Sequence, residues 1–316
     1  MKLQQLRYAL EVYRHNLNVS EAADALFTSQ PGISKQIRLL EEELGIQIFI
    51  RSGKRVVSVS QPGKAVLGIS ERILRDVQNI KNIGSEFTDH DSGSLTIATT
   101  HTQARYALPK IVAEFVKNYP KVNLTIKQGS PSAIAQMVSS GEADLAIITE
   151  RIDDHPELGK LPCYEWNHAV IVPHDHPLLD CRNPLSLEDL ASFPLVTYEF
   201  AFNSGSSIAR TFNKAHIEQP DVALSAADTD VLKTYVRLGL GVGLMAKMAY
   251  DPVVDQDLQL IDAAHLFEPS PTWIALRTDT YLRGYAYDFI QMFAPKLTRE
   301  AVDRILYTPV VEDFSI

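Results

Sequence analysis

Four polar side chains that donate or accept hydrogen bonds lie at helical spacing near residue 30. Gln30, Ser34, Lys35 and Arg38 lie within the segment SQPGISKQIRLLEEELG. Glutamine pairs with adenine, arginine pairs with guanine, and serine and lysine bind bases or phosphates. On the exposed side of a helix, these residue types favour contact with double-stranded DNA. The alternative is a surface helix whose polar residues are merely solvated.

A second group of polar residues falls where two expected strands end. Thr99 and Thr100 end the strand-like segment LTIATT, Thr102 and Gln103 follow it, and Thr149 ends a later strand on the same expected sheet edge. Hydroxyls, an amide and free backbone N–H groups at a helix start bind an anion without a formal charge. The alternative is that threonine simply favours strands and helix caps. The grouping on one edge favours the anion site.

Motifs of enzyme chemistry are absent from the sequence. It contains no HExxH, GxSxG or CxxC, and its histidines are scattered. A metal site through His174 and His176 is the remaining alternative of this kind. The stretch GLGVGLM is not placed as a dinucleotide-binding loop and is expected to be a helix end that turns into a strand. We therefore expect no enzyme, no cofactor and no resident metal.

The DNA-reading residues require a small helical scaffold, which the first 45 residues supply. Leucines and Tyr13 at steps of three and four predict a helix over 3–15, and EAADALF predicts a second helix with Ser20 as its N-cap. Thr28 or Ser29 caps a third helix, which Gly45 ends. Its predicted buried stripe is Ile33, Ile37, Leu40 and Leu44. The pattern is a helix-turn-helix.

A small wing is predicted directly after these helices. Two short strands, the second alternating at Val57 and Val59, flank a turn at Ser52-Gly53, and the basic residues of this wing would hold phosphates. Together the third helix and the wing give the expected DNA contacts: Ser29, Gln30, Pro31, Ser34, Lys35, Arg38, Arg51, Lys54 and Arg55.

A long helix from about Gln61 to Glu86 follows the wing. Its apolar residues recur at steps of three and four, and a helix projecting from so small a domain would leave them exposed. Pairing with a second chain is the expected remedy, and packing on the same chain is the alternative. The expected dimer contacts are Val66, Ile69, Ile73, Val77 and Ile80.

The rest of the chain alternates strands with helices. Segments such as LTIATT, ALPKIVAEFVKNYP and VNLTIKQG predict a βαβαβ unit with a mostly parallel sheet, and a second such unit is expected over about 166–265. The C-terminal segments TWIALRT and YLRGYAYDFIQMFAP would then return to the first unit. Two lobes joined by crossing strands bind ligands in the cleft between them.

Composition sets the class of protein. The 316 residues are 45% hydrophobic, which suits about two globular domains, and no apolar run is long enough to span a membrane. The two cysteines make no disulfide framework, so the cytoplasm is the expected location. The net charge of −9 divides into +2 on residues 1–60 and −11 on the rest. A slightly basic head on an acidic body indicates two kinds of partner.

These segments resemble a known family. LQQLRY, SQPGISKQIRLLEEELGIQIFIRSGKR and QPGKAVL resemble LysR-type transcriptional regulators, and TTHTQARYALP with DTDVLKTYVRLGLGVGLMA resembles their CysB/Cbl branch, regulators of sulfur assimilation. The resemblance implies a winged helix-turn-helix domain over 1–60, a linker and dimerisation helix over 61–87 and a two-lobed α/β effector-binding domain over 88–316, like periplasmic binding proteins. Lobe I would take about 88–162 and 266–316, and lobe II about 163–265.

The resemblance also implies ligands and partners. Thr100, Thr102, Gln103 and Thr149 would contact an acidic effector, with Trp166 in the same cleft and Tyr198 from the facing lobe. The family commonly has TGRS after this strand, whereas this chain has Asn203 at the matching place and no arginine. Implied effectors are N-acetylserine or O-acetylserine, with sulfate or thiosulfate as antagonists. Implied partners are promoter DNA, further copies in a homodimer or homotetramer and RNA polymerase, without a membrane.

Two alternatives stay open at this stage. The first is a Cbl-like regulator of sulfonate-sulfur use that responds to adenylyl sulfate. The second, from another class, is a solute-binding protein, which the missing export signal and the basic head disfavour.

Overall fold

The computed structural model describes residues 1–53, 55–88, 90–149, 155–181, 184–203, 206–217, 220–278 and 280–307. The chain divides into two compact units, Met1–Thr88 and Asp89–Ile316. Each unit buries apolar cores of its own. Within the described ranges, no helix combines the length and the apolar character that crossing a bilayer requires.

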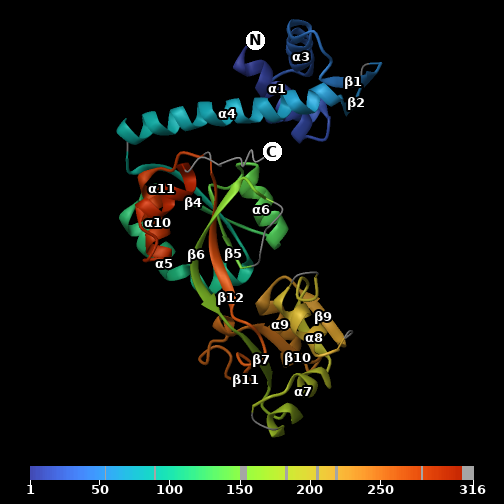
Figure 1. Cartoon of the computed structure of the whole chain (residues 1–316), viewed down its shortest axis with the longest axis vertical. Coiled ribbons are helices and arrows are strands. Elements are labelled where there is room, and N and C mark those ends of the chain that lie inside the picture. The colour runs from blue at the N-terminus through green and yellow to red at the C-terminus, as the bar shows by residue number, and fades with distance from the viewer. Residues whose placement is uncertain are drawn as a thin grey trace, which may run out of the picture. The chain divides into compact units, whose positions relative to one another are not determined.

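The first unit is a helical domain with a two-stranded hairpin and one long helix (Figure 1). Its core joins residues from all of these elements, among them Leu6, Ile33, Ile37, Leu40 and Phe49, each at most 3% exposed. Its elements are α1 (Leu3–Arg14), α2 (Val19–Ala25), α3 (Gln30–Leu44), β1 (Phe49–Ser52), β2 (Arg55–Val59) and α4 (Gln61–Thr88).

The helix ends of this unit follow local capping rules. Ser29 caps α3 by accepting from the Gly32 backbone N–H at 3.3 Å, and Gly45 ends the helix in the left-handed conformation with φ of 68°. The prediction of Ser20 as the cap of α2 is wrong. Asn18 is the cap, since its side-chain oxygen accepts from the next two free backbone N–H groups at 3.1 and 3.3 Å. Asparagine satisfies them as well as serine would, so the helix begins before Ser20.

Two predicted apolar positions lie at the surface. Leu44 is 38% exposed at the last residue of α3. In the hairpin, the register shifts between Ile50 and Arg51. Val56 therefore faces the core at 8% exposure, whereas Val57 is 48% exposed.

The apolar residues of α4 serve two purposes. Val66, Leu67 and Ile73 pack against the core of the first unit. Ile69, Ile80 and Ile83 are 48%, 68% and 40% exposed. The predicted stripe is therefore divided: its first turns anchor the helix to its own domain, and its outer residues present an apolar surface.

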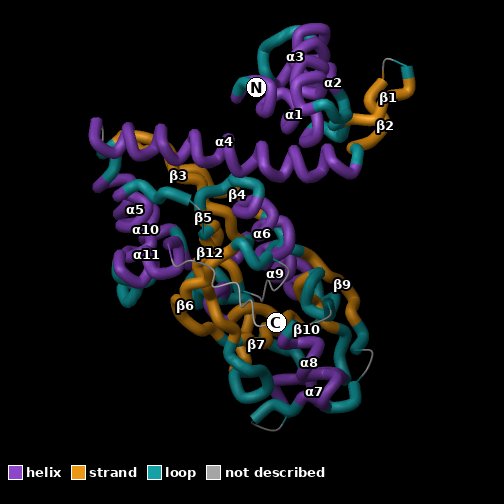
Figure 2. The backbone as a smooth tube through the Cα atoms, turned by 45° about the horizontal axis from the view of Figure 1, so that its top comes forward, coloured by secondary structure: helices purple, strands orange, loops and turns teal. Residues whose placement is uncertain are grey.

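The second unit contains two five-stranded sheets, whose strands are drawn in orange in Figure 2. The first sheet has the order β4-β3-β5-β12-β6. Strands β3, β4 and β5 are parallel to one another, and β12 runs antiparallel to both of its neighbours, β5 and β6. Helices α5, α10 and α11 cover one face, and α6 covers the other (Figure 1). This lobe contains β3 (Ser92–Thr99), η1 (Gln103–Ala107), α5 (Pro109–Asn118), β4 (Lys121–Gln128), α6 (Pro131–Ser139), β5 (Leu145–Ile148), β6 (Leu158–Trp166), β12 (Ser270–Arg277), α10 (Gly284–Phe293) and α11 (Arg299–Tyr307).

The second sheet has the order β11-β7-β10-β8-β9. Strand β10 is parallel to β8 and antiparallel to β7. This lobe contains β7 (His168–Pro173), η2 (Pro177–Asp180), α7 (Leu187–Ala191), β8 (Leu195–Tyr198), α8 (Ser207–Lys214), β9 (Val222–Ala226), α9 (Thr229–Arg237), β10 (Val242–Ala246), η3 (Lys247–Ala249) and β11 (Leu258–Asp262).

Two strand crossings join the lobes. The chain passes from β6 to β7 through Asn167 and returns between β11 and β12. Strands β6 and β12 run side by side and antiparallel from Leu158 to Trp166, with one register shift between Thr272 and Trp273 (Figure 1). The predicted turn in GLGVGLM is confirmed: α9 ends before Gly239, whose φ is 75°, and β10 begins at Val242.

Candidate functional site

The exposed side of α3 carries the predicted DNA-reading residues. Gln30, Lys35 and Arg38 are exposed. Ser34 is partly buried and accepts from the Gln30 amide at 3.2 Å. The Ser29 hydroxyl accepts the hydrogen bond that caps the helix, and Pro31 lies in the first helical turn. The helix therefore presents one amide and two cations to a partner.

In the wing beside α3, one predicted cation is paired with a buried glutamate and another is exposed to solvent. Arg51 pairs with Glu41 at 2.8 Å, and its side chain is 23% exposed. Arg55 is exposed. Lys54 lies outside the described residues. Arg51 thus stabilises the wing, whereas Arg55 stays available to a phosphate.

A groove of about 570 Å³ connects the wing to the helix-turn-helix. Gln30 and Arg55 line it together with the start of α2. The backbone N–H groups of Ser20 and Glu21 at this helix start are bonded to the Asn18 side chain, so Arg55 is the cation that this groove offers to a phosphate. The groove is lined by His15, Asn16, Leu17, Asn18, Val19, Ser20, Glu21, Gln30, Arg55 and Val56.

A cavity of about 220 Å³ lies between the two lobes of the second unit. Six of the seven predicted effector residues line it: Thr100, Thr102, Gln103, Thr149, Trp166 and Tyr198. The seventh, Asn203, is exposed and is not among the lining residues. Its backbone N–H donates to the Phe200 carbonyl in a turn. Tyr198, Phe200, Ser206 and Ser207 bring the second lobe to the cavity.

Hydrogen bonds fix the polar wall of this cavity. Tyr164 donates to the Gln103 amide oxygen at 2.5 Å, which orients that amide. The hydroxyl oxygens of Thr102 and Thr229 are 2.9 Å apart, and that of Tyr198 lies 3.0 Å from Thr229. Side chains from both lobes therefore share one network of hydroxyl groups.

A cation at the second lobe's wall is absent from the residues predicted from the sequence. Helix α8 begins at Ser207, and Ser206 caps it by accepting from the Ala209 N–H at 3.0 Å. Arg210 follows in the first turn and lines the cavity. A serine pair ahead of a helix with an arginine in its first turn was the available signal, since such a helix start favours anions.

His168 was also missed as a cavity residue. It lines the cavity at 3% exposure, and burial lowers its pKa to about 4, so the imidazole is neutral at pH 7. Its Nδ1 and the Nε1 of Trp166 are buried and have no hydrogen-bond partner among the described residues. Glu268, at the rim, is paired with Lys214 at 3.3 Å. The lining therefore combines neutral groups with Arg210 and with Glu268, whose charge is paired with that of Lys214.

The alternative metal site has other uses for its residues. His174 contacts the Gln256 carbonyl at 2.6 Å and the Gln259 amide at 2.8 Å. His176 accepts from the Leu178 backbone N–H at 3.1 Å and caps a short helix. Both imidazoles are therefore engaged in hydrogen bonds with neighbouring backbone or side-chain groups.

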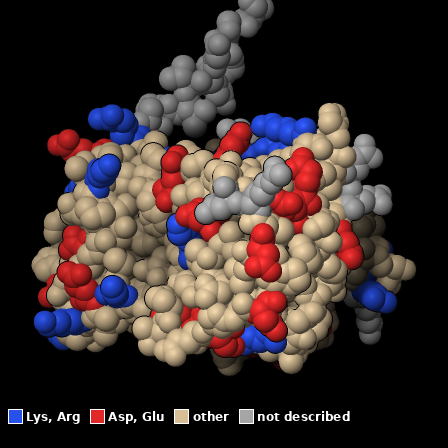
Figure 3. All heavy atoms as spheres, turned by 90° about the horizontal axis from the view of Figure 1, so that it is seen from below, with Lys and Arg blue, Asp and Glu red and all other residues tan. Residues whose placement is uncertain are grey.

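The charges on the body are mixed. On the face drawn in Figure 3, Asp and Glu side chains lie among Lys and Arg side chains. That face shows no broad basic patch of the kind that holds a nucleic acid backbone.

A winged helix-turn-helix followed by a two-lobed ligand-binding domain defines a ligand-responsive DNA-binding regulator. Residues 3–64 match the bacterial regulatory helix-turn-helix proteins of the lysR family, and residues 88–298 match the LysR substrate binding domain. The chain belongs to the LysR family of transcriptional regulators, which are not enzymes.

Relatives place it in the CysB/Cbl branch of that family. It is 50% identical to the transcriptional regulator SsuR of Burkholderia cenocepacia, over 97% of this chain and 99% of SsuR. It is 51% identical to CysB of Haemophilus influenzae, over 96% and 93%. The cofactor-binding domain of the Cbl regulator has a similar structure, with a TM-score of 0.63, 39% identity, and coverage of 69% of this chain and 95% of that domain.

Proposed function

We propose that this regulator controls sulfur-assimilation and cysteine-biosynthesis genes in response to a small anion bound between its lobes. The observation that carries the proposal is the inter-lobe cavity with its wall of hydroxyls, one amide and Arg210. Such a wall binds a carboxylate or sulfate through hydrogen bonds and one charge. The similarity to CysB and Cbl supports the sulfur-related role.

The size of the cavity favours a small metabolite. At about 30 Å³ for each water molecule, about 220 Å³ holds roughly seven. Pockets for drug-sized ligands take about 300–1,000 Å³. N-acetylserine, O-acetylserine, sulfate and thiosulfate suit the smaller space. Adenylyl sulfate, the ligand of the Cbl-like alternative, carries a nucleoside and needs a wider opening of the lobes.

The head contacts promoter DNA with α3 and the wing in this proposal. Gln30 and Arg38 meet base edges, while Lys35 and Arg55 hold phosphates. Two heads joined through the exposed residues of α4 would read successive major grooves, and two such dimers would form a homotetramer. We also propose that the domains divide at about residues 60 and 87, and the lobes at about residues 162 and 265. RNA polymerase is a further proposed partner, and the cytoplasm is the proposed location.

Effector control requires that the ligand prefer one assembled state over another. Lobe closure around the anion would change how the dimer or tetramer spaces its heads. Occupancy without such a preference would shift nothing.

Calorimetry of the full chain against N-acetylserine, O-acetylserine, sulfate, thiosulfate and adenylyl sulfate tests the proposal. Thr100→Val removes a hydroxyl that lines the cavity at 7% exposure. A hydrogen bond to a charged group contributes about 1.5–3 kcal/mol, so affinity should fall roughly 10- to 100-fold.

Thr125→Val is the matched control, since Thr125 lies in β4 and does not line the cavity. It should bind like the parent. An unaltered affinity of Thr100→Val would remove the cavity from effector binding. Binding of the anions without any affinity of the head for DNA would favour the solute-binding alternative.

A further inference from the structure

The segment that joins β3 to α5 contacts both the ligand cavity and helix α9 of the second lobe. Thr100, Thr102 and Gln103 line the cavity, whereas Arg105 and Tyr106 do not. Helical winding turns these last two side chains toward α9 of the second lobe. One short segment therefore reaches both the ligand cavity and the opposite lobe.

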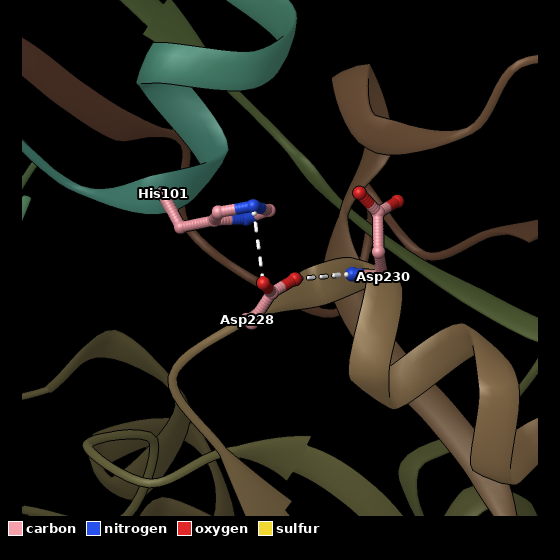
Figure 4. Close-up of side chains that lie close together, drawn as sticks. All are labelled: His101, Asp228 and Asp230. Carbon is pink, nitrogen blue, oxygen red and sulfur yellow. Dashed lines mark hydrogen bonds and ion pairs between the residues drawn. The ribbon is translucent and has the colours of Figure 1, made fainter.

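Three side chains of this segment contact the start of α9. His101 Nε2 lies 3.1 Å from an Asp228 carboxylate oxygen, as Figure 4 shows. Arg105 pairs with Asp230 at 3.1 Å, and the Tyr106 hydroxyl donates to the other Asp230 oxygen. Each contact involves a carboxylate. The Arg105–Asp230 pair, with side chains 60% and 42% exposed, contributes little by itself because solvent screens it.

Tyr106 also covers a buried ion pair of the second lobe. Lys233 and Asp255 lie 2.6 Å apart with side chains 3% and 1% exposed. The Lys233 ammonium donates to the Tyr106 hydroxyl at 3.2 Å and lies 5.0 Å from the centre of its ring. Opening the lobes would break these contacts and expose the pair to water.

The same cluster has the spacing of a metal site, but its groups are already engaged. Ligand atoms of His101, Asp228 and Asp230 lie within 4.8 Å of one another. Asp228 accepts from His101 and from the Asp230 backbone N–H at 2.8 Å. The Asp230 carboxylate points away from the other two side chains in Figure 4, toward Arg105 and Tyr106. The geometry is that of a contact between lobes.

We propose that these residues form an inter-lobe clasp that holds the lobes closed and thereby sets the affinity for the effector. The clasp consists of His101, Thr102, Arg105 and Tyr106 on one lobe and Asp228, Thr229 and Asp230 on the other. It rests on the proposed function, since it assigns positioning residues to that same cavity. Thr102 couples the two, because it lines the cavity and bonds Thr229 across the lobes.

The clasp would act on the populations of molecules with open and closed lobes. If only closed lobes bind well, the apparent affinity falls by the fraction of molecules that are closed. Tyr106→Phe removes one hydroxyl bonded to Asp230 and Lys233 and leaves the ring in place. We expect the Kd for N-acetylserine and for sulfate to rise about tenfold in calorimetry of the full chain.

A distance measurement separates closure from ligand contact. Spin labels at Lys117→Cys in α5 and Glu188→Cys in α7 would report on the two lobes, with Cys163 and Cys181 replaced. Tyr106→Phe should broaden the inter-lobe distance distribution toward longer values. Saturating N-acetylserine should narrow it again.

Tyr287→Phe is the matched control. Its hydroxyl donates to Asp303 at 2.5 Å, and both residues lie in the first lobe. It should leave the affinity and the distances unchanged.

The outcomes decide the proposal. A weaker affinity with unchanged distances would overturn the clasp and make Tyr106 a ligand contact. A broadened distribution with unchanged affinity would show that closure does not set affinity. If the parent bound no anion, the proposed function would fail, and broadening in Tyr106→Phe alone would still support the clasp as a structural element.

Discussion

Glu41 is the side chain whose removal tests the construction of the DNA-reading head most directly. It is 7% exposed on α3, and one of its oxygens accepts from the backbone N–H groups of Ile48 and Phe49 at 2.9 and 3.0 Å. The other oxygen pairs with Arg51 at 2.8 Å. One carboxylate therefore holds the start of the wing against the recognition helix.

The expected cost of Glu41→Ala follows from these contacts. Ile48 and Phe49 are fully buried, so both N–H groups lose their acceptor at about 1–3 kcal/mol each. The partly exposed Arg51 adds at most about 1 kcal/mol. The total is about 2–7 kcal/mol, a large part of the stability of a small domain.

Amide hydrogen exchange of the full chain measures this locally. A loss of 3 kcal/mol corresponds to more than 100-fold faster exchange at Ile48 and Phe49, if these amides exchange by local opening. Affinity for DNA should fall to a similar degree on all sequences, because Arg55 loses its placement. Glu42→Ala is the control, since Glu42 is the exposed neighbour on the same helix. Equal protection of the wing amides in Glu41→Ala and the parent would refute the reasoning.

Two further substitutions test the other surfaces of the head. Arg38→Ala should weaken binding to the preferred promoter sequence by about 1–3 kcal/mol and relax specificity at one position if the guanidinium reads a base; unchanged gel-shift affinity and specificity would remove Arg38 from the interface. Ile80→Glu should break the dimer without unfolding the head, because Ile80 is 68% exposed. Sedimentation of this variant like the parent would place the dimer contact elsewhere, and Ile73→Glu is the poorer test because Ile73 packs on the head core.

Periodicity predicted the helices of the head well because their signals are local. The stripe of Ile33, Ile37 and Leu40 is buried, and Ser29 and Gly45 bound α3. Periodicity did not separate Asn18 from Ser20 as a cap, since both side chains suit the position.

The run Glu41-Glu42-Glu43 shows where a charge pattern misleads. It has the appearance of a solvated helix face, yet Glu41 is buried while its two neighbours are exposed. Glu41 lies four residues after Ile37 and so falls on the buried side. That spacing was the available signal, but the partners on the wing depend on how the hairpin packs.

The threonine cluster was predictable because strand ends of one parallel sheet meet at one edge. Thr100, Thr102 and Thr149 line the cavity as the order of strands requires. In the second lobe, the family resemblance named Tyr198, whereas Arg210 and His168 were not found, because which side chains of that lobe face the cavity depends on how the lobes pack. Asn203 was assigned to the site by its position in the chain, and its turn leads it to the surface.

The sequence by itself determined the kind of protein: a cation-bearing recognition helix, a wing, and a hydroxyl-rich edge in a two-lobed body. These features rest on residue type and on spacings of a few positions, which local geometry converts directly into faces and edges. The tertiary structure decided which groups act together. Arg51 turns inward to Glu41, and Tyr106 meets Asp230 more than a hundred residues away. Such pairs depend on the packing of whole elements and lobes, for which the chain carries no local signal.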